Sequence, residues 1–148
     1  MINIIAVGKK HDPNITDAIN DYEKRLRAPF EVKWVLLPYS SAKNGDEARQ
    51  DESERIISQL RPADFVVLLD ERGQDLSSPD FSALLTSQQN IVIIIGGAYG
   101  VNDELRQRAD RVISLSAMVF PHQLVRLILI EQIYRAQAIA TNHPYHHS

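Results

Sequence analysis

The stretch that decides the fold is Ile91-Val92-Ile93-Ile94-Ile95-Gly96-Gly97-Ala98-Tyr99-Gly100. None of its first five residues is polar, which is typical of a strand that is covered on both faces. Strands of that kind belong to parallel sheets with helices on either side. Three glycines follow, and they would let backbone amides approach a ligand without obstruction by a Cβ atom. A tight turn without any ligand explains these glycines equally well.

On both sides of this stretch, strand and helix signals alternate along the chain. Strands are predicted at residues 2–7, 32–37, 65–69, 91–95 and 111–115. Helices are predicted to open at Asp12-Pro13-Asn14, to span 46–60, and to follow Pro79, Asn102 and Pro121. This order predicts an α/β fold with a mainly parallel sheet of five to six strands and helices on both faces. The length of 148 residues predicts one domain over residues 1–148.

Composition restricts the partners of the chain. The formal net charge is -3, so a polyanion must be held by a local basic patch rather than by overall charge. The absence of cysteine excludes thiolate chemistry and suits the cytoplasm. The apolar run at residues 2–7 lacks the preceding basic residues of a signal peptide. No apolar run approaches the roughly 20 residues of a membrane span. We therefore expect a cytoplasmic protein with no membrane and no DNA partner.

Ligands of parallel sheets bind beyond the carboxyl ends of the strands, where three loops compete: residues 70–73, 96–100 and 116–122. The glycines at 96–100 do not form a phosphate-binding P-loop, because no Gly-Lys-Ser/Thr follows. A dinucleotide fingerprint would follow the first strand instead. Asp70 has the position of the phosphoacceptor in receiver domains, but these need an acidic pair after the first strand to hold Mg²⁺. Gly8-Lys9-Lys10 stands there, which argues against a receiver domain.

The loop at residues 115–122 is unusual because it is mostly apolar: Leu-Ser-Ala-Met-Val-Phe-Pro-His. Loops between strands and helices are normally polar, since they lie on the surface. Apolar residues at strand ends indicate a flat organic ring lying against them. The alternative is that they pack beneath the last helix.

The last helix carries apolar residues in every direction between Leu124 and Ile139. A helix of this kind is buried on more than one side. In so short a chain it covers the sheet with one side only, which predicts that the other side meets a second copy in a homodimer. Arg126 and Arg135 would then lie at or near the interface. A simpler interpretation is that they extend along the surface or pair with Glu131, which precedes Arg135 by four residues.

The tail at residues 142–147, Asn-His-Pro-Tyr-His-His, places imidazole and aromatic groups together. A metal site is disfavoured because no Cys or carboxylate joins the cluster, so we expect no metal. Stacking against an unpaired RNA base suits an aromatic ring near arginines better. An inert, frayed tail is the other interpretation.

Several of these motifs, in this order and spacing, resemble those of the RlmH family. Its members are small SPOUT-class methyltransferases that modify N3 of a pseudouridine in large-subunit (23S) ribosomal RNA. The resemblance covers nearly the whole chain. It is carried by residues 6–9 (AVGK), 21–26 (DYEKRL), 95–97 (IGG), 115–122, 131–136 (EQIYRA) and 142–146 (NHPYH). The chain departs from the family at Ala98-Tyr99, where members often have Pro or Ser after the two glycines.

The resemblance implies a homodimer with a C-terminal trefoil knot, acting on the ribosome. It also implies S-adenosylmethionine as cofactor. The implied cofactor-binding residues are Leu69, Gly96, Leu115, Ser116, Ala117, Met118, Val119 and Phe120.

Methyl transfer to an imide nitrogen needs alignment and the removal of one proton. His122 and His143 are candidate bases. Arg126 and Arg135 are candidates to hold phosphate or to stabilise the imidate anion, and Tyr145 is a candidate to stack on the base. The alternatives are a non-enzymatic nucleotide-binding module and a SPOUT methyltransferase with another RNA target.

Overall fold

The computed structural model describes residues 1–147. Within them the chain forms strands and helices in the following order: β1 (Ile2–Val7), α1 (Pro13–Arg25), β2 (Val32–Leu37), α2 (Gly45–Ser58), β3 (Phe65–Asp75), α3 (Ser78–Ser87), β4 (Ile91–Ile95), α4 (Asp103–Arg108), β5 (Arg111–Ser114) and α5 (His122–Ala140). The predicted alternation of strands and helices is confirmed.

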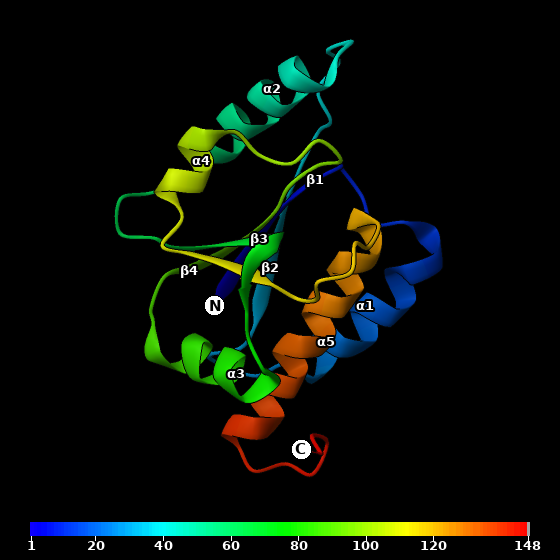
Figure 1. Cartoon of the computed structure of the whole chain (residues 1–148). Helices are drawn as coiled ribbons and strands as arrows, with labels where there is room; N and C mark the ends of the chain where they lie inside the picture. The colour runs from blue at the N-terminus through cyan, green and yellow to red at the C-terminus, as the bar shows by residue number, and fades with distance from the viewer. Residues whose placement is uncertain (148) are drawn as a thin grey trace.

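The strands form one parallel sheet in the order β2-β1-β4-β3-β5 (Figure 1). β4 lies at the centre and all five of its residues are buried, as its apolar sequence predicts. It pairs with β1 from Asn3↔Val92 to Ala6↔Ile95. On its other side it pairs with β3 from Phe65↔Ile91 to Leu69↔Ile95. The α/β class and the parallel sheet are confirmed, with five strands in residues 1–147, whereas the trefoil knot stays a prediction.

Helices cover both faces of the sheet (Figure 1). On one face, α1, α3 and α5 bury Ile19, Phe81 and Ile133 against the sheet. On the other face, α2 and α4 bury Ile56 and Leu105 against it. The prediction of helices on both faces is confirmed.

The helix starts follow from local capping chemistry. α1 begins at Pro13, and the side chain of Asp12 accepts a hydrogen bond from the backbone N–H of Asn14 at 2.8 Å. α2 begins after Asn44, whose side chain accepts from the N–H of Glu47. α5 begins at His122, directly after Pro121. Pro121 fits there because its missing N–H would have no partner at a helix start.

β3 differs from its prediction. It does not end at Leu69, and residues 70–73 are not a separate loop, because the strand continues to Asp75. Its pairing with β5 shifts register between Leu69 and Gln74, which is a β-bulge. Gly73 lies so close to β5 that a Cβ atom there would be 2.7 Å from the backbone of Ile113. The bulge turns residues 70–72 out of the ladder and toward the carboxyl ends of the strands, where they line a pocket.

α5 packs against two helices as well as the sheet, because it lies between α1 and α3 (Figure 1). Its fully buried apolar residues are Leu129, Ile130, Ile133 and Ala136. The neighbouring helices account for much of its apolar character, so this character alone does not require a second copy, and the homodimer stays a prediction. Leu124 near its start is exposed.

Candidate functional site

A pocket of about 670 Å³ lies at the carboxyl ends of β3 and β4. Three segments line it: the end of β3 with its bulge, the end of β4 with the glycine loop, and the connection from β5 into α5. The fold thus brings together the three loops that the sequence offers as candidate ligand sites. Of the residues that the resemblance assigns to the cofactor, all except Ala117 line this pocket: Leu69, Gly96, Leu115, Ser116, Met118, Val119 and Phe120.

The glycine loop combines both of its sequence interpretations. It makes a tight turn, in which the N–H of Gly100 donates to the carbonyl of Gly97 at 3.1 Å, and it also lines the pocket. At Gly97 a Cβ atom would lie 2.5 Å from Oε1 of Glu52. A side chain at this position would therefore require the buried carboxylate of α2 to shift.

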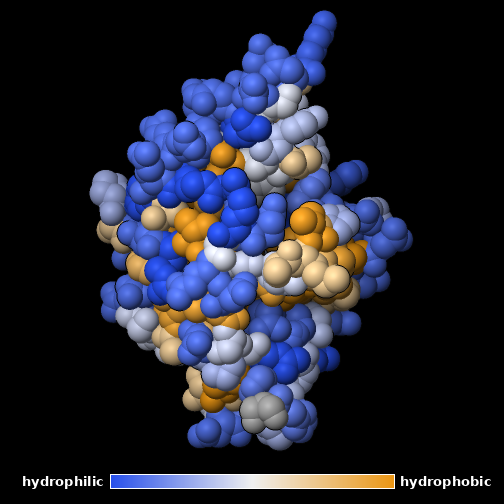
Figure 2. Space-filling model, viewed as in Figure 1, coloured by the Kyte–Doolittle hydropathy of each residue, from blue (hydrophilic) through white to orange (hydrophobic). Residues whose placement is uncertain are grey.

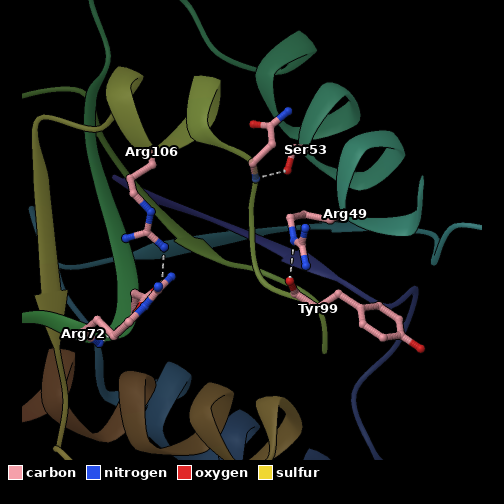
Figure 3. A network of polar contacts seen from close by, with 7 residues as sticks. Arg49, Ser53, Arg72, Tyr99 and Arg106 are labelled. Atoms are coloured by element: carbon pink, nitrogen blue, oxygen red, sulfur yellow. Dashed lines mark hydrogen bonds and ion pairs between the residues drawn. The ribbon is translucent and has the colours of Figure 1, made fainter. Parts of the chain in front are cut away.

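Polar contacts fix the glycine loop to α2 (Figure 3). Nε of Arg49 donates to the backbone carbonyl of Tyr99 at 2.8 Å. The N–H of Asn102 donates to the hydroxyl of Ser53 at 2.9 Å. The Tyr99 ring lies over the start of α2, where it would contact a Cβ atom at Gly45. The glycine-loop wall of the pocket is thus held by side chains of α2, which lies on the opposite face of the sheet from α5.

Asp70 has a structural partner rather than a free carboxylate. Nη2 of Arg106 lies 2.5 Å from one of its oxygens, and the backbone N–H of Arg72 donates to the other at 2.8 Å. Although partial burial opposes ionisation, these bonds hold the pKa of Asp70 below its usual value. The pair fixes α4 to the bulge of β3 at the rim of the pocket.

The connection between β5 and α5 exposes apolar side chains. Met118 and Val119 are 73% and 76% exposed, so they do not pack beneath the last helix. Figure 2 shows hydrophobic residues gathered on this side of the molecule. The backbone itself is ordered by Ser116, whose carbonyl accepts from the hydroxyl of Ser114 at 2.6 Å and whose hydroxyl accepts from the N–H of Met118 at 3.0 Å. An exposed apolar segment of this kind indicates a binding surface.

His122 lies at the mouth of the pocket, at the first residue of α5. Its Nε2 is 2.8 Å from the hydroxyl of Tyr39. Partial burial lowers the pKa of His122, and the positive charge of Arg126 lowers it further, while Glu52 acts in the opposite direction. The imidazole is therefore mainly neutral at pH 7, and one of its ring nitrogens has a lone pair that can accept a proton.

Glu52 and Tyr39 are site residues that the sequence reasoning missed. Glu52 is only 4% exposed; its Oε2 accepts from the N–H of Ser40 at 2.9 Å, and its Oε1 has no hydrogen-bond partner among the described residues. Because Ser40 follows Tyr39, this bond also fixes the loop that carries the Tyr39 hydroxyl to His122. Neither residue lines the pocket itself, but Tyr39 contacts His122 and Glu52 lies against Gly97, both of which do. No motif spacing marks Tyr39 and Glu52, and only the fold brings them to these positions.

Arg126 is completely buried. Its Nη2 donates to the carbonyls of Val7 and Gly8 at 2.9 and 3.0 Å, and its Nη1 donates to the carbonyl of Lys10 at 3.1 Å. The left-handed backbone at Gly8 (φ 118°) leaves space for this guanidinium, which a Cβ atom would approach to 2.9 Å. Arg126 therefore lies behind His122 as a fixed positive charge. This position favours a structural role over the predicted contact with RNA.

The remaining candidates gather at the opposite end of α5. Arg135 pairs with Glu131 at 2.8 Å, as the spacing of four residues predicts. Its guanidinium lies 4.8 Å from the ring centroid of Tyr145, which in turn contacts Tyr134 edge to face at 4.7 Å. Burial and a hydrogen bond with Tyr22 raise the pKa of Tyr145 to about 12, so its hydroxyl stays protonated. We name Arg135, Tyr145 and His143 the C-terminal cluster.

The C-terminal cluster does not meet the pocket within one protomer. Arg135 follows His122 by more than three turns of α5, about 20 Å along the helix axis. None of the three residues of the cluster lines the pocket. Figure 1 shows the segment that follows α5 beyond the last turn of this helix, away from the connection that precedes it. Of the predicted catalytic residues, only His122 reaches the pocket directly.

Residues 1–147 contain no group of three or more His, Cys, Asp or Glu side chains arranged to hold a metal ion. None of their helices combines the length and apolar character of a membrane span.

Comparison with known proteins gives a consistent result. The family model described as "Predicted SPOUT methyltransferase" matches residues 1–146. A protein of Parabacteroides distasonis named Ribosomal RNA large subunit methyltransferase H is 43% identical, with 99% of this chain and 98% of that protein covered. Proteins of the same name from Trichlorobacter lovleyi and Geobacter sulfurreducens are 41% and 42% identical, each with 99% of both chains covered.

A solved structure supports the fold. The SpoU methyltransferase AviRb from Streptomyces viridochromogenes, solved in complex with the cofactor AdoMet, matches with a TM-score of 0.51 and 16% identity. The match covers 91% of this chain and 57% of that one. Taken with the sequence relatives, these findings place the chain in the SPOUT methyltransferases and, among them, in the family of ribosomal RNA large subunit methyltransferase H.

Proposed function

We propose that this protein is an S-adenosylmethionine-dependent methyltransferase that modifies N3 of a pseudouridine in large-subunit ribosomal RNA. The observation that carries the proposal is the pocket at the ends of β3 and β4. Seven of the eight residues implied for the cofactor line it, in a chain whose full-length relatives carry the name of such an enzyme. We place this activity on assembled ribosomal particles in the cytoplasm.

The lining of the pocket fits the proposed cofactor. Its volume of about 670 Å³ lies within the range of roughly 300–1,000 Å³ that is usual for small-molecule sites. Leu69, Phe120 and Val125 offer apolar contact to a flat ring. The backbone around Gly96 and Leu115 offers polar groups at the ends of the strands. When bound, the cofactor supplies an activated methyl group, and the protein supplies alignment and proton handling.

His122 is the proposed proton acceptor. It lies at the pocket, and its lowered pKa keeps it neutral at pH 7. When the N3–H bond breaks, the proton would go to His122 and the electron pair would stay on N3. That pair would form the bond to the methyl group as the bond between the methyl group and the cofactor sulfur breaks, and S-adenosylhomocysteine would leave. The Tyr39 hydroxyl holds the ring in place, and Glu52 favours the cation that forms. Within one protomer His143 lies at the other end of α5 and does not line this pocket, so only a partner subunit could bring it to the site.

We further propose that the active unit is a homodimer. One protomer keeps the pocket and the C-terminal cluster about 20 Å apart along α5, so a site that uses both needs a second copy. Met118 and Val119 at the rim of the pocket and Leu124 in the first turn of α5 are exposed apolar residues, and they provide a surface for that copy.

Labelled S-adenosylmethionine and ribosomes that lack the modification test the proposal. We expect label in large-subunit RNA, at N3 of one pseudouridine when the methyl group is mapped. Cofactor binding without transfer to any ribosomal particle would instead show a non-enzymatic nucleotide-binding module. Label at another nucleotide would show a SPOUT methyltransferase with a different RNA target. A His122→Asn variant that retains cofactor affinity is the matched control for the chemical step.

A further inference from the structure

We propose that a second, basic cleft of this protein binds a phosphodiester of the RNA backbone. The cleft lies between the C-terminal ends of α1 and α5, has a volume of about 310 Å³, and is separate from the cofactor pocket. Lys24, Arg25, Arg27 and His143 line it, together with Gln137 and Thr141. We name it the α1–α5 cleft. The inference rests on the proposed function for the identity of the nucleic acid as RNA.

The charges that line the cleft are all of one sign. No Asp or Glu belongs to its lining, although the chain as a whole has a formal net charge of -3. Lys24 pairs with Asp21 at 3.3 Å, but both side chains are well exposed, so this pair is weak. Among the described residues, Arg25 and Arg27 form no ion pair. The α1–α5 cleft is thus a local basic patch of the kind that an acidic protein needs in order to hold a polyanion.

The walls of the cleft are fixed before a ligand arrives. Gln137 of α5 bridges to the end of α1, because its Oε1 accepts from the N–H of Arg27 at 2.6 Å and its Nε2 donates to the carbonyl of Arg25 at 2.9 Å. Nη1 of Arg27 donates to the carbonyl of Lys24 at 2.8 Å. The Arg25 guanidinium lies 5.6 Å from the ring centroid of Tyr134. A pre-ordered pair of guanidinium groups loses little entropy on binding a phosphate.

The surroundings favour RNA over an isolated anion. Tyr134 lines the cleft and also contacts Tyr145 of the C-terminal cluster, so cations and aromatic rings follow each other along one surface. Single-stranded nucleic acid is bound in this way, with cations along the backbone and rings stacked on bases. The cleft would hold the phosphate of a nucleotide whose neighbour lies at the C-terminal cluster.

Substitution of both arginines tests the proposal. In Arg25→Gln/Arg27→Gln, we expect weaker binding to large ribosomal subunits that lack the modification, and a salt slope (log K against log [KCl]) that is reduced by about 1 for each lost phosphate contact. KM for these subunits should rise while kcat and cofactor affinity stay unchanged. Arg25→Lys/Arg27→Lys should keep most of the salt slope because both positive charges remain. This control distinguishes a loss of charge from a folding defect in the glutamine variant. Lys33→Gln, an exposed lysine of β2 outside the cleft, is the matched control. A slope equal to that of the unsubstituted protein would overturn the proposal.

Crosslinking identifies the partner without relying on methyl transfer. Because the chain has no cysteine, a single Thr141→Cys substitution places one photoreactive label at the cleft. We expect crosslinks to ribosomal RNA, and none from a label at Lys33→Cys. Crosslinks only to ribosomal protein would overturn the proposal in favour of a protein partner. If RNA crosslinks form but no methyl group is transferred, the cleft stands and the proposed function fails.

Discussion

At the scale of single residues, the pKa of His122 predicts how methyl transfer depends on pH. The neutral imidazole is the form that accepts a proton, and burial and Arg126 lower its pKa below 6.5. Single-turnover transfer should therefore rise with pH through a midpoint below 6.5 and stay level above it. The same shift affects stability: its contribution is present above the unfolded pKa of 6.5 and is lost as the pH falls through the folded pKa. Titration of the His122 ring by NMR, assigned with His122→Asn, gives the midpoint directly.

Removal of the Glu52 carboxylate should shift the midpoint of the His122 titration. Its carboxylate raises the pKa of His122 against the effect of burial and Arg126, so Glu52→Gln should move both the NMR midpoint and the acidic limb of the transfer rate to lower pH. Cofactor affinity, measured by calorimetry, should change little. Glu54→Gln, a neighbouring exposed carboxylate of α2, is the control. An unchanged His122 midpoint in Glu52→Gln would remove Glu52 from the proposed mechanism.

Gly97 predicts a steric conflict with the same carboxylate. Gly97→Ala would place a Cβ atom 2.5 Å from Oε1 of Glu52, and overpacking of this kind typically costs about 1–3 kcal/mol of unfolding free energy. Cofactor binding should weaken because the loop must shift. A Glu52→Asp substitution shortens the side chain and should restore part of both losses in the double variant. Denaturant unfolding and cofactor calorimetry of the unsubstituted protein, the two single variants and the double variant decide whether this contact causes the losses in stability and affinity.

At the scale of elements, two arginines of α5 have opposite expected roles. Arg126 ties α5 to the connection between β1 and α1 through three backbone carbonyls, and each buried acceptor left unpaired costs about 1–3 kcal/mol. Arg126→Met should therefore lower the unfolding free energy strongly. Arg135→Met removes a pair with Glu131, whose two side chains are 24% and 19% exposed, and the contact with the Tyr145 ring. It leaves no set of backbone carbonyls unpaired, so it should destabilise the fold less than Arg126→Met, while transfer to ribosomes is lost. Equal destabilisation by the two variants would contradict these roles.

The elements were largely predictable from sequence, and the exceptions have physical reasons. β4 and α1 follow from an unbroken apolar run and from an Asp-Pro start, both of which are local signals. The continuation of β3 through its bulge depends on pairing with β5 and on the close approach at Gly73, which no local pattern encodes. Arg126 was predicted as a contact residue because a charge on an apolar helix suggests an interface. Its true partners lie at β1, more than 110 residues away in sequence, and only the tertiary fold brings them together.

At the scale of the whole molecule, the separation of the pocket from the C-terminal cluster predicts complementation between subunits. His122→Asn and Arg135→Gln should each abolish transfer alone. A mixture whose subunits have exchanged contains mixed dimers with one intact site each, so about a quarter of the sites should work. The measurement is methyl transfer before and after subunit exchange. If each site belongs to one protomer, the mixture stays inactive and the dimeric site is refuted.

The hydrogen bonds from Arg126 to the carbonyls of Val7 and Gly8 have a consequence for folding during translation. They join positions 119 and 118 residues apart, and β1 also needs β4 as a neighbour. A nascent polypeptide therefore leaves the carbonyls of Val7 and Gly8 without this guanidinium until α5 has emerged. Contacts this distant in sequence slow folding and lengthen the time during which chaperones and proteases have access. Truncation within α5 should thus release an aggregation-prone chain rather than a shortened native protein.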